Sequence, residues 1–519
     1  MDKRCHTGFS GWVWGTCLGL FLAAGCVSPN VSADKAVANL RAGNDPAALG
    51  WSEKLKHSIY SKPLGFLETG RVRMLSGDFL GSSTNFAPLI DTVIEKTETG
   101  PVVKLGSVGA NVMSGTITDD RTRGYEVPAY EFVQALQYQM LNHLFLGNPD
   151  AASVEARRAV FAQDAIAEKY GKEVQEARVT AEAKQTNSLG AVDARMQGMA
   201  PVLEMTRSSF ENGLAWYLSG VLLEAQADTG NAAVAFRKAW ELSPGNPYVQ
   251  KDFLRVLRTQ DTELFKRLSE QAGVDPKTLV RGKTEIILLV EEAFVPQRQS
   301  VKIPIPVPGV NTLTSVDFPL YQAPAYVPMA LELREKDQTV GMSALALSVQ
   351  SLAYRDLKEK IPGIVVRNVT RVATQIAAQA AVNASGNDYA KAAVLLVNVG
   401  KTLLTRADTR AWYTLPMAVQ LYRGGVAPGA HTFELRNQVT GFVTRVPVTV
   451  AEGETRVVWV ADLGGNARVA TASLDGKGAP TTFQVCGSML AGYPPVTQPG
   501  GPKTLHGACA PDVGTGRKE

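Results

Sequence analysis

The stretch of residues 213–244, which reads GLAWYLSGVLLEAQADTGNAAVAFRKAWELSP, decides the fold class of the helical part of this chain. Its large and small residues recur at spacings that place them on the facing sides of two successive helices. The pattern residues are Trp216, Gly220, Ala232, Phe236, Ala239 and Pro244. Large side chains fill the shared faces, small ones allow the backbones to approach, and the proline lies past the second helix, which it cannot continue. We therefore predict a helical hairpin that packs on further helices.

These positions match the signature of a tetratricopeptide unit, and a weaker match covers residues 131–163. The weaker unit contains the inter-helix turn 146–150, the small residues Ala152 and Ala159, and Leu136 at the position of the large aromatic residue. Because repeat units cannot bury their faces alone, the helical stretches 164–210 and 248–272 are expected to supply the remaining faces. Residues 125–273 are thus predicted to form a tetratricopeptide-like helical domain.

From Lys283 onward the hydrophobic period changes from that of helices to that of strands. The predicted strands are 284–290, 300–307 and 328–334, and the predicted helices are 343–358 and 364–406, the latter with a break at 385–387. The prolines of 300–307 favour an edge strand. Charged residues in 364–406 argue against a membrane span and favour an amphipathic hairpin packed on a sheet. Residues 280–406 are therefore predicted to be a mixed strand and helix region.

Short strand-like runs separated by turn residues fill residues 407–475 and predict a small β-sandwich. The runs are 417–422, 430–435, 444–450 and 454–460. Beyond them, residues 476–519 form a Pro/Gly-rich tail. Along the whole chain, the pattern predicts an α+β multidomain protein with a helical repeat domain, a mixed α/β region and a small β-sandwich.

The first 25 residues have the layout of a secretory signal, with Lys3 and Arg4, a short apolar run, and small residues before Cys26. The ending of this segment, LAAGC at 22–26, resembles a bacterial lipobox, although Ala23 stands where a large aliphatic residue is usual. We expect the thiol of Cys26 to carry a diacylglycerol that holds the chain to a membrane. The alternative is a cleaved export signal without a lipid.

Val27 and Ser28 follow Cys26, so the second position of the mature chain is not acidic. By the sorting rule familiar from enteric bacteria, this resembles an outer-membrane lipoprotein, and we expect the periplasmic face rather than the cell surface. Residues 26–124 are predicted to be a tether and an irregular N-terminal region. The polar part up to about Gly50 would be the tether, and 51–124 would hold short helices and loops.

Cysteine usage agrees with export. Cys486 and Cys509 are an even pair outside the signal and the lipidation site, and an oxidising compartment favours a disulfide between them. Such a bond would close the loop that contains most of the Pro/Gly-rich tail. The alternative is two unpaired thiols.

The combined pattern resembles a family of largely uncharacterised bacterial envelope lipoproteins with tetratricopeptide-like helices and a C-terminal α/β part. The likeness is strongest at residues 138–158, which include the run VEARR, and at 407–416, ADTRAWYTLP, where the family has an Ala-Asp-x-Arg-x-Trp run followed by Leu-Pro. It covers about residues 120–465 and implies a role in the cell envelope.

Several kinds of chemistry find no support in the sequence. The formal net charge of +4 is too small to indicate nucleic-acid binding. The histidines outside the signal are far apart and form no metal-binding pattern. The triplets 282–284 and 400–402 read Gly-Lys-Thr, but neither has the upstream glycine that a phosphate-binding loop needs. We expect no metal, no cofactor, no nucleic-acid partner and no enzymatic activity.

Acidic pairs at 119–120 and 291–292 are candidates for glycoside chemistry in name, but solvated pairs are the expected interpretation. Asp408, Arg410 and Trp412 could form a site. We favour instead a buried ion pair under the tryptophan that braces the junction between the helical hairpin and the sandwich.

The leading functional hypothesis is a membrane-anchored scaffold that binds an envelope protein or a peptide segment of one. The first helices of tetratricopeptide units line a concave surface, on which Tyr217, Val221 and Glu224 would face the partner. The alternative for these three residues is ordinary solvent exposure. A rival function is glycan binding or action on peptidoglycan by the C-terminal α/β region. A third is a structural subunit whose repeats bind further copies of the protein.

Overall fold

Helices occupy most of the N-terminal half of the protein in a computed structural model that describes residues 29–97, 100–104, 124–306, 314–321, 328–384, 407–439, 441 and 443–490. The helices are α2 (Pro29–Arg41), α3 (Asp45–Lys56), α4 (Lys62–Leu75), α5 (Phe79–Val93), α6 (Ala129–Phe145), α7 (Pro149–Met196), α8 (Ala200–Leu203), α9 (Gly213–Ala225), α10 (Thr229–Leu242), α11 (Pro247–Gln260), α12 (Thr262–Ala272) and α13 (Val349–Ala384). Short 3₁₀ turns lie at η2 (Gln197–Met199) and η3 (Pro276–Thr278).

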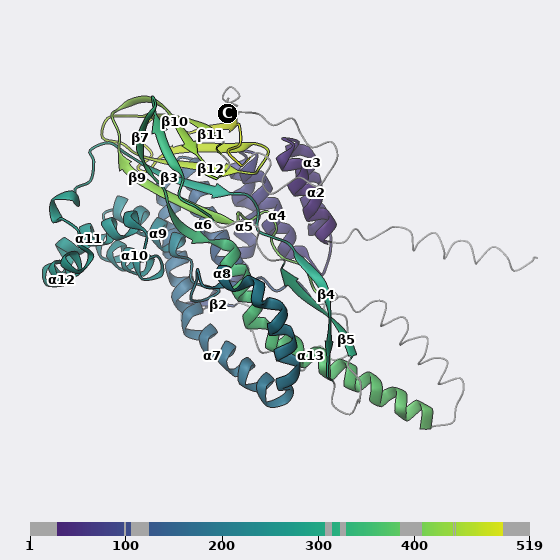
Figure 1. The fold of residues 1–519 in the computed structure, drawn as a ribbon. Helices are drawn as coiled ribbons and strands as arrows, with labels where there is room; N and C mark the ends of the chain where they lie inside the picture. The colour runs from purple at the N-terminus through teal and green to yellow at the C-terminus, as the bar shows by residue number, and fades with distance from the viewer. Residues whose placement is uncertain are drawn as a thin grey trace, which may run out of the picture.

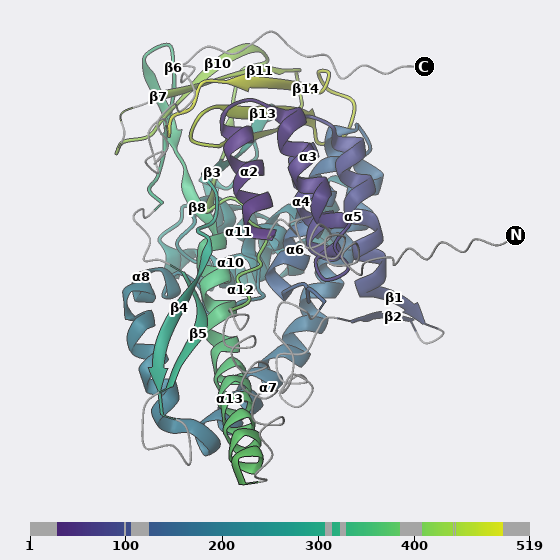
Figure 2. The same ribbon diagram turned by 90° about the vertical axis from the view of Figure 1, so that its right-hand side faces the viewer.

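Helices α2 to α5 lie side by side as successive packed neighbours (Figure 2). Ala33, Ala36 and Leu40 recur at three- and four-residue spacing on one face of α2, and all three are buried. Asn44 then caps the first turn of α3. The predicted tether is therefore wrong from Pro29 onward, because the small alanines form an apolar stripe that packs on the rest of the protein.

The predicted repeat region consists of the paired helices α6–α7, α9–α10 and α11–α12. The chain reverses between α6 and α7 at residues 146–148, inside the predicted turn. A Cβ atom added to Gly220 would lie 2.9 Å from the Phe236 ring, so α9 and α10 cross closely at this point. Helix α7 runs for 48 residues, well past the predicted end of its unit at residue 163.

The strands form two larger sheets and two ribbons. They are β1 (Ile94–Thr97), β2 (Gly100–Val103), β3 (Glu285–Glu292), β4 (Arg298–Ile305), β5 (Thr314–Tyr321), β6 (Glu332–Glu335), β7 (Gln338–Met342), β8 (Ala344–Ser348), β9 (Ala418–Gly425), β10 (Gly429–Arg436), β11 (Val443–Val450), β12 (Thr455–Asp462), β13 (Ala467–Ser473) and β14 (Thr482–Cys486). The six-stranded sheet has the order β14-β13-β12-β3-β9-β8, and the four-stranded sheet has the order β11-β10-β6-β7. In the six-stranded sheet β3 is parallel to β12 and antiparallel to β9.

The six-stranded sheet is covered on both faces (Figure 1). Alternate residues of β3 point to opposite sides, so Ile287 and Leu289 join the large helical core, whereas Ile286, Leu288 and Val290 join the core between the two sheets. A strand that is buried on both faces reads as a continuous apolar run, as this one does. The sheet is therefore the layer that joins the helices to the second sheet.

The predicted boundary at residue 407 does not separate the sheets. Strands from residues 418–473 enter both sheets, and each sheet also contains strands from residues 285–348. The central strand β3 and the short strand β6 come from the region predicted as a separate mixed unit. The two predicted C-terminal units therefore share their hydrogen-bonded sheets.

The long helices α7 and α13 and the ribbon β4–β5 extend together away from the sheets (Figures 1 and 2). The predicted edge strand at 300–307 corresponds to β4, which pairs with β5. Helix α13 packs mainly along α7, whereas packing on a sheet was expected. The second half of that predicted hairpin, from residue 385, lies outside the described residues. Among the described residues, no helix is long and apolar enough to cross a membrane.

Candidate functional site

The residues predicted to face a partner lie on the inner side of the helix pairs, where the chain covers them itself. Tyr217 and Val221 are 0% and 1% exposed. The Tyr217 hydroxyl donates a hydrogen bond of 2.8 Å to Asp252 on α11. Glu224 is largely buried and accepts a 2.7 Å hydrogen bond from Arg255. Tyr217 and Val221 therefore offer no exposed surface to a partner in this structure, because they are buried and Asp252 of α11 and Arg423 of β9 lie against Tyr217.

Strand β9 supplies the side chain that fills this inner face. Arg423 donates to Asp252 at 2.8 Å and to Glu285 of β3 at 2.6 Å. Burial alone would lower the pKa of Arg423, but the nearby Asp252, Tyr217 and Glu285 raise it well above its usual value. Burial would raise the pKa of Glu285, and the Arg423 and Arg281 guanidinium groups lower it below its usual value instead. The contact is thus a buried ion-pair network that locks the helices to the sheet.

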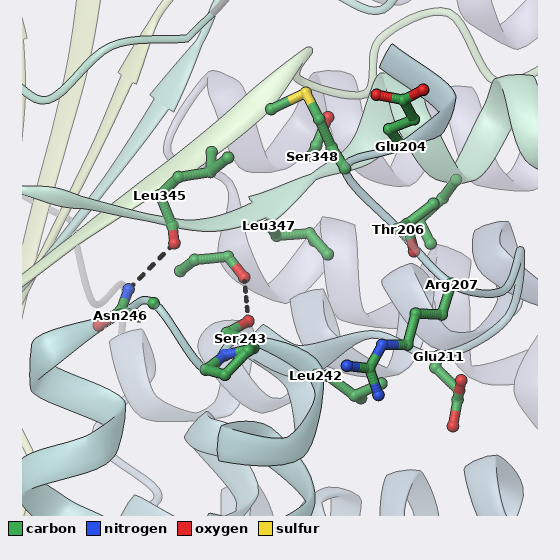
Figure 3. A pocket seen from close by; sticks show the side chains of 15 residues that line it. Glu204, Thr206, Arg207, Glu211, Leu242, Ser243, Asn246, Leu345, Leu347 and Ser348 are labelled. Atoms are coloured by element: carbon green, nitrogen blue, oxygen red, sulfur yellow. Dashed lines mark hydrogen bonds between the residues drawn. The ribbon is translucent and has the colours of Figure 1, made fainter. Parts of the chain in front are cut away.

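An open cleft of about 430 Å³ lies beside this locked face (Figure 3). Its first wall is the turn between α10 and α11, and that turn caps the outer strand β8. Asn246 donates to the carbonyl oxygen of Leu345 at 3.1 Å, and Ser243 donates to that of Ala346 at 3.3 Å. The same Asn246 side chain accepts the N–H groups at the start of α11. Side chains thus satisfy carbonyl groups that a neighbouring strand would otherwise bond.

The opposite wall of the cleft is the connection 204–211 between α8 and α9. Bonds from α13 hold this connection: Ser351 donates to the carbonyl oxygen of Val202 at 2.6 Å, and Arg355 donates to that of Thr206 at 3.0 Å. Ser209 donates to the carboxyl group of Glu359. Burial raises the pKa of Glu359 to about 7, although the Ser209 bond lowers it. The cleft therefore has two anchored walls.

The floor of the cleft is apolar, and its rim carries the carboxyl groups of Glu204 and Glu211 as well as the guanidinium group of Arg207. Leu347 and Leu352 are buried beneath it, and Leu242 and Leu345 are half-buried at its sides. Figure 3 shows the exposed side chain of Arg207 extending across the cleft towards Leu242. An apolar floor with a few convergent polar groups is the usual composition of a binding site. We therefore take this cleft as the candidate functional site.

The Asp408–Arg410 ion pair forms, but Asp408 is only partly buried and the contacts of Arg410 run to the connection between α3 and α4, whereas a junction with the helical hairpin 364–406 was expected. Arg410 donates to both carboxylate oxygens of Asp408, at 2.8 and 2.6 Å, and to the carbonyl oxygen of Tyr60 at 2.6 Å. Trp412 is completely buried, and its ring packs between Phe86 and Tyr138 with centroids 5.7 and 5.8 Å away. The segment 408–412 thus ties the N-terminal helices to the strands. The contacts of the Asp408–Arg410 pair are those of a structural ion pair.

Two buried carboxyl groups hold the same segment from the helical side. Glu131 accepts the backbone N–H of Trp412 at 3.0 Å, and Glu68 accepts that of Tyr413 at 2.7 Å. Glu68 also accepts the Thr414 hydroxyl at 2.6 Å. Burial raises the pKa of Glu68 to about 7 and raises that of Glu131 as well, although their hydrogen bonds oppose the shift. Adjacent N–H groups of this irregular turn segment therefore meet two carboxyl groups in the protein interior.

The acidic pair 291–292 is buried, which corrects the expectation of a solvated pair. Glu291 forms an ion pair with the buried Arg71, and Glu292 accepts a 2.9 Å hydrogen bond from Gln420. Both residues lie on the central strand β3, whose side chains alternate between two covered faces. The pair at 119–120 lies outside the described residues.

The remaining predicted sites fall largely outside the described residues. Cys26 and Cys509 lie there, as does the triplet 400–402. Cys486 is disulfide-bonded, and the pairing with Cys509 stays a prediction. In the triplet 282–284, the hydroxyl of Thr284 is occupied by the N–H of Gly453 at 2.9 Å. Within the described ranges, no three His, Cys, Asp or Glu side chains gather as metal ligands would.

One sequence feature could have indicated the cleft, the Asn246-Pro247 dipeptide. This dipeptide marks the start of a helix, because asparagine caps the first turn and proline fits the first helical position. The dipeptide does not indicate that the side-chain amide of Asn246 also donates a hydrogen bond to a carbonyl oxygen of β8. No sequence feature marked Arg207 as part of a site, because a single arginine in a polar connection between helices is common. No known protein family matches the chain, and no curated protein sequence matches it either.

Proposed function

We propose that this protein is a lipid-anchored scaffold of the bacterial cell envelope, without enzymatic activity, which binds an extended segment of an envelope protein in the cleft beside β8. The anchor would be the lipid on Cys26, and the body would lie on the periplasmic side of the outer membrane. The observation that carries the binding proposal is the outer strand β8, which faces a cleft and has its carbonyl groups held by side chains.

An extended partner suits this geometry for a physical reason. A peptide that adds to a sheet edge bonds the backbone of that edge, and it places alternate side chains in neighbouring pockets. Asn246 and Ser243 already provide donors to β8, so a partner strand would replace two weak side-chain bonds with backbone bonds. The apolar floor would take alternate side chains. Arg207 would pair with a carboxylate of the partner, because its planar guanidinium group binds carboxylates in a bidentate manner.

The finer description of the fold belongs to the same proposal. We infer that the helix pairs are tetratricopeptide-like, which the close crossing at Gly220 and Phe236 supports. We also infer that the two larger sheets form a β-sandwich-like unit, since a separate apolar core fills the space between them. In this protein the concave side of the repeats would then serve internal packing, and binding would take place at the neighbouring sheet edge.

The cleft is tested by charge reversal at its rim. The lipidated protein is crosslinked in cells and captured, and the yield of its crosslinked partner is compared between Arg207→Glu and Arg237→Glu. Arg237 is the matched control, since it is exposed on α10 and its 3.7 Å contact with Glu241 contributes little to stability. We expect Arg207→Glu to lower the yield roughly tenfold, as loss of a charged hydrogen bond does, and Arg237→Glu to leave it unchanged. Equal yields from the two variants would show that the partner binds elsewhere.

Two further measurements test the lipid anchor on Cys26 and the rival function of glycan binding. Intact-mass analysis of the mature protein should show a chain that begins at Cys26 and carries fatty acids, and Cys26→Ser should lack them. Sedimentation with purified cell wall addresses the glycan-binding alternative. Cosedimentation that is equal for the parent protein and Arg207→Glu would favour that alternative.

A further inference from the structure

The described chain begins very close to the predicted lipid. Only Val27 and Ser28 separate Cys26 from Pro29, the first residue of α2. A fully extended chain spans at most about 3.6 Å per residue, so the start of α2 lies within roughly 11 Å of the acylated residue. The polar headgroup layer on each side of a bilayer is about 6 Å deep. The start of this packed helix is therefore held at the membrane surface if Cys26 is acylated.

The connection between α3 and α4 lies at the same end of the helical array. Asn30, at the start of α2, donates to the hydroxyl of Thr409 at 2.8 Å. The next residue, Arg410, donates to the carbonyl oxygen of Tyr60 at 2.6 Å. Adjacent residues of the segment 409–410 thus bridge the start of α2 and the connection 57–61.

This end of the protein exposes large apolar side chains. Ile59 is 79% exposed, Tyr60 is 41% exposed and Val31 is 44% exposed. Ile59 has the largest exposed fraction among the exposed large hydrophobic residues of the described chain. Exposed apolar residues grouped on one face of a protein indicate contact with a protein or a membrane.

The connection that carries Ile59 and Tyr60 is positively charged; Glu53, just before it, pairs with Arg73, and the exposed Asp34 lies one turn from Val31 on α2. The stretch from Lys54 to Lys62 reads KLKHSIYSK and contains no acidic residue, and the next acidic residue along the chain is the buried Glu68. Lys54 and Lys62 are exposed. Lysines beside interfacial apolar groups are attracted to anionic headgroups and keep their ammonium groups in water. We name the surface formed by Val31, Lys54, Ile59, Tyr60 and Lys62 the anchor face.

We propose that the anchor face lies on the lipid bilayer, with Ile59 and Tyr60 inserted at the headgroup level. This inference rests on the proposed lipidation of Cys26. Acyl chains hold the protein to the membrane, and the anchor face determines which side of the body faces it. The arm formed by α7 and α13 and the cleft beside β8 would then keep a fixed orientation above the bilayer.

The test measures the depth of two positions in the same anchored protein. Full-length lipidated protein is reconstituted into vesicles of phosphatidylethanolamine and phosphatidylglycerol. An environment-sensitive fluorophore is attached at Ile59→Cys in one sample and at Val280→Cys in another. Val280 is the matched control, since it is 67% exposed and follows α12, which lies across the molecule from α2 (Figure 1). Neither side chain packs in the core, so neither label should disturb folding.

Nitroxide-labelled lipids should quench the fluorophore at position 59 at least roughly twofold more than the one at position 280. Flotation of the protein with the vesicles separates the two proposals. If the protein floats and both labels are quenched equally, the anchor face is wrong and the lipid anchor stands. If the parent protein does not float with the vesicles, or floats no better than Cys26→Ser, both proposals are overturned.

Discussion

Replacing Glu68 by glutamine should change how the stability of the protein depends on pH. Glu68 is completely buried, and its carboxyl group accepts the N–H of Tyr413 and the hydroxyl of Thr414. Burial raises its pKa in the folded protein to about 7, against 4.5 for an unburied glutamate. Between these two values the folded state holds a proton that the unfolded state has lost.

The sign and size of the effect follow from this difference. Because the folded-state pKa is raised, the contribution of Glu68 is favourable below about pH 4.5 and is lost as the pH rises through 7. Between pH 5 and pH 8 the loss amounts to about 2.5 kcal/mol of unfolding free energy. Glutamine is neutral throughout and keeps an acceptor for Tyr413. Its stability relative to the parent should therefore improve by about 2.5 kcal/mol between pH 5 and pH 8.

Urea unfolding of the parent and of Glu68→Gln at pH 5 and pH 8 measures this difference directly. Comparing the two proteins at each pH removes the contributions of other buried acids, such as Glu359 and Asp462, whose pKa values burial also raises, to about 7 and about 6. Glu263→Gln on α12 is the control, since its side chain is 85% exposed, and it should follow the parent at both pH values. A stability difference for Glu68→Gln that is the same at pH 5 and pH 8 would refute the reasoning.

Two further substitutions test how the helices are packed. Gly220→Ala should cost roughly 1–3 kcal/mol of unfolding free energy, because the new methyl group would lie 2.9 Å from the Phe236 ring. The control is Gly230→Ala, which should cost nothing because no atom lies within 4 Å of the added methyl group. Equal unfolding free energies for the two variants in urea would contradict the close crossing of α9 and α10. Arg423→Met should cost roughly 3–5 kcal/mol, since it removes the buried guanidinium group that joins the carboxylates of Asp252 and Glu285. Arg445→Met, which breaks an exposed pair with Glu434, should change stability by about 0.5 kcal/mol or less, and a similar loss for both arginine variants would show that the buried network is weak.

The sequence contained enough information to locate the helix pairs and about half of the described strands, whereas β8 lies in the stretch 343–358 that was predicted to be a helix. The spacing of Trp216, Gly220, Phe236 and Ala239 reflects contacts between neighbouring helices, which depend on residues that are close along the chain. The β3 run was recognisable for a similar reason, because its unbroken apolar character follows from burial on both faces. Both features depend on residues that are close along the chain, so the local sequence pattern is enough to predict them.

The pairing of strands that are far apart along the chain could not be predicted from the sequence. Strand β3 pairs with β12 and β9, and nothing in its composition distinguishes these partners from others. Tyr217 illustrates the same limit at the level of a site. An inward-facing tyrosine on a paired helix has the same sequence pattern whether a foreign peptide or the protein's own sheet covers it. The predicted tether failed because alanines form a weak apolar stripe that sequence alone does not distinguish from a flexible linker.

The parallel pairing of β3 with β12 constrains how the chain acquires its structure. Glu285 and Thr455, which face each other in this pair, are 170 residues apart. Synthesis from the N-terminus makes the helical half first, and β3 then has no strand partner until β9 and β12 have been made. During that interval β3 is an apolar strand with both backbone edges unpaired, a state that favours association with other chains. Completion of the six-stranded sheet therefore depends on the strands that are made last.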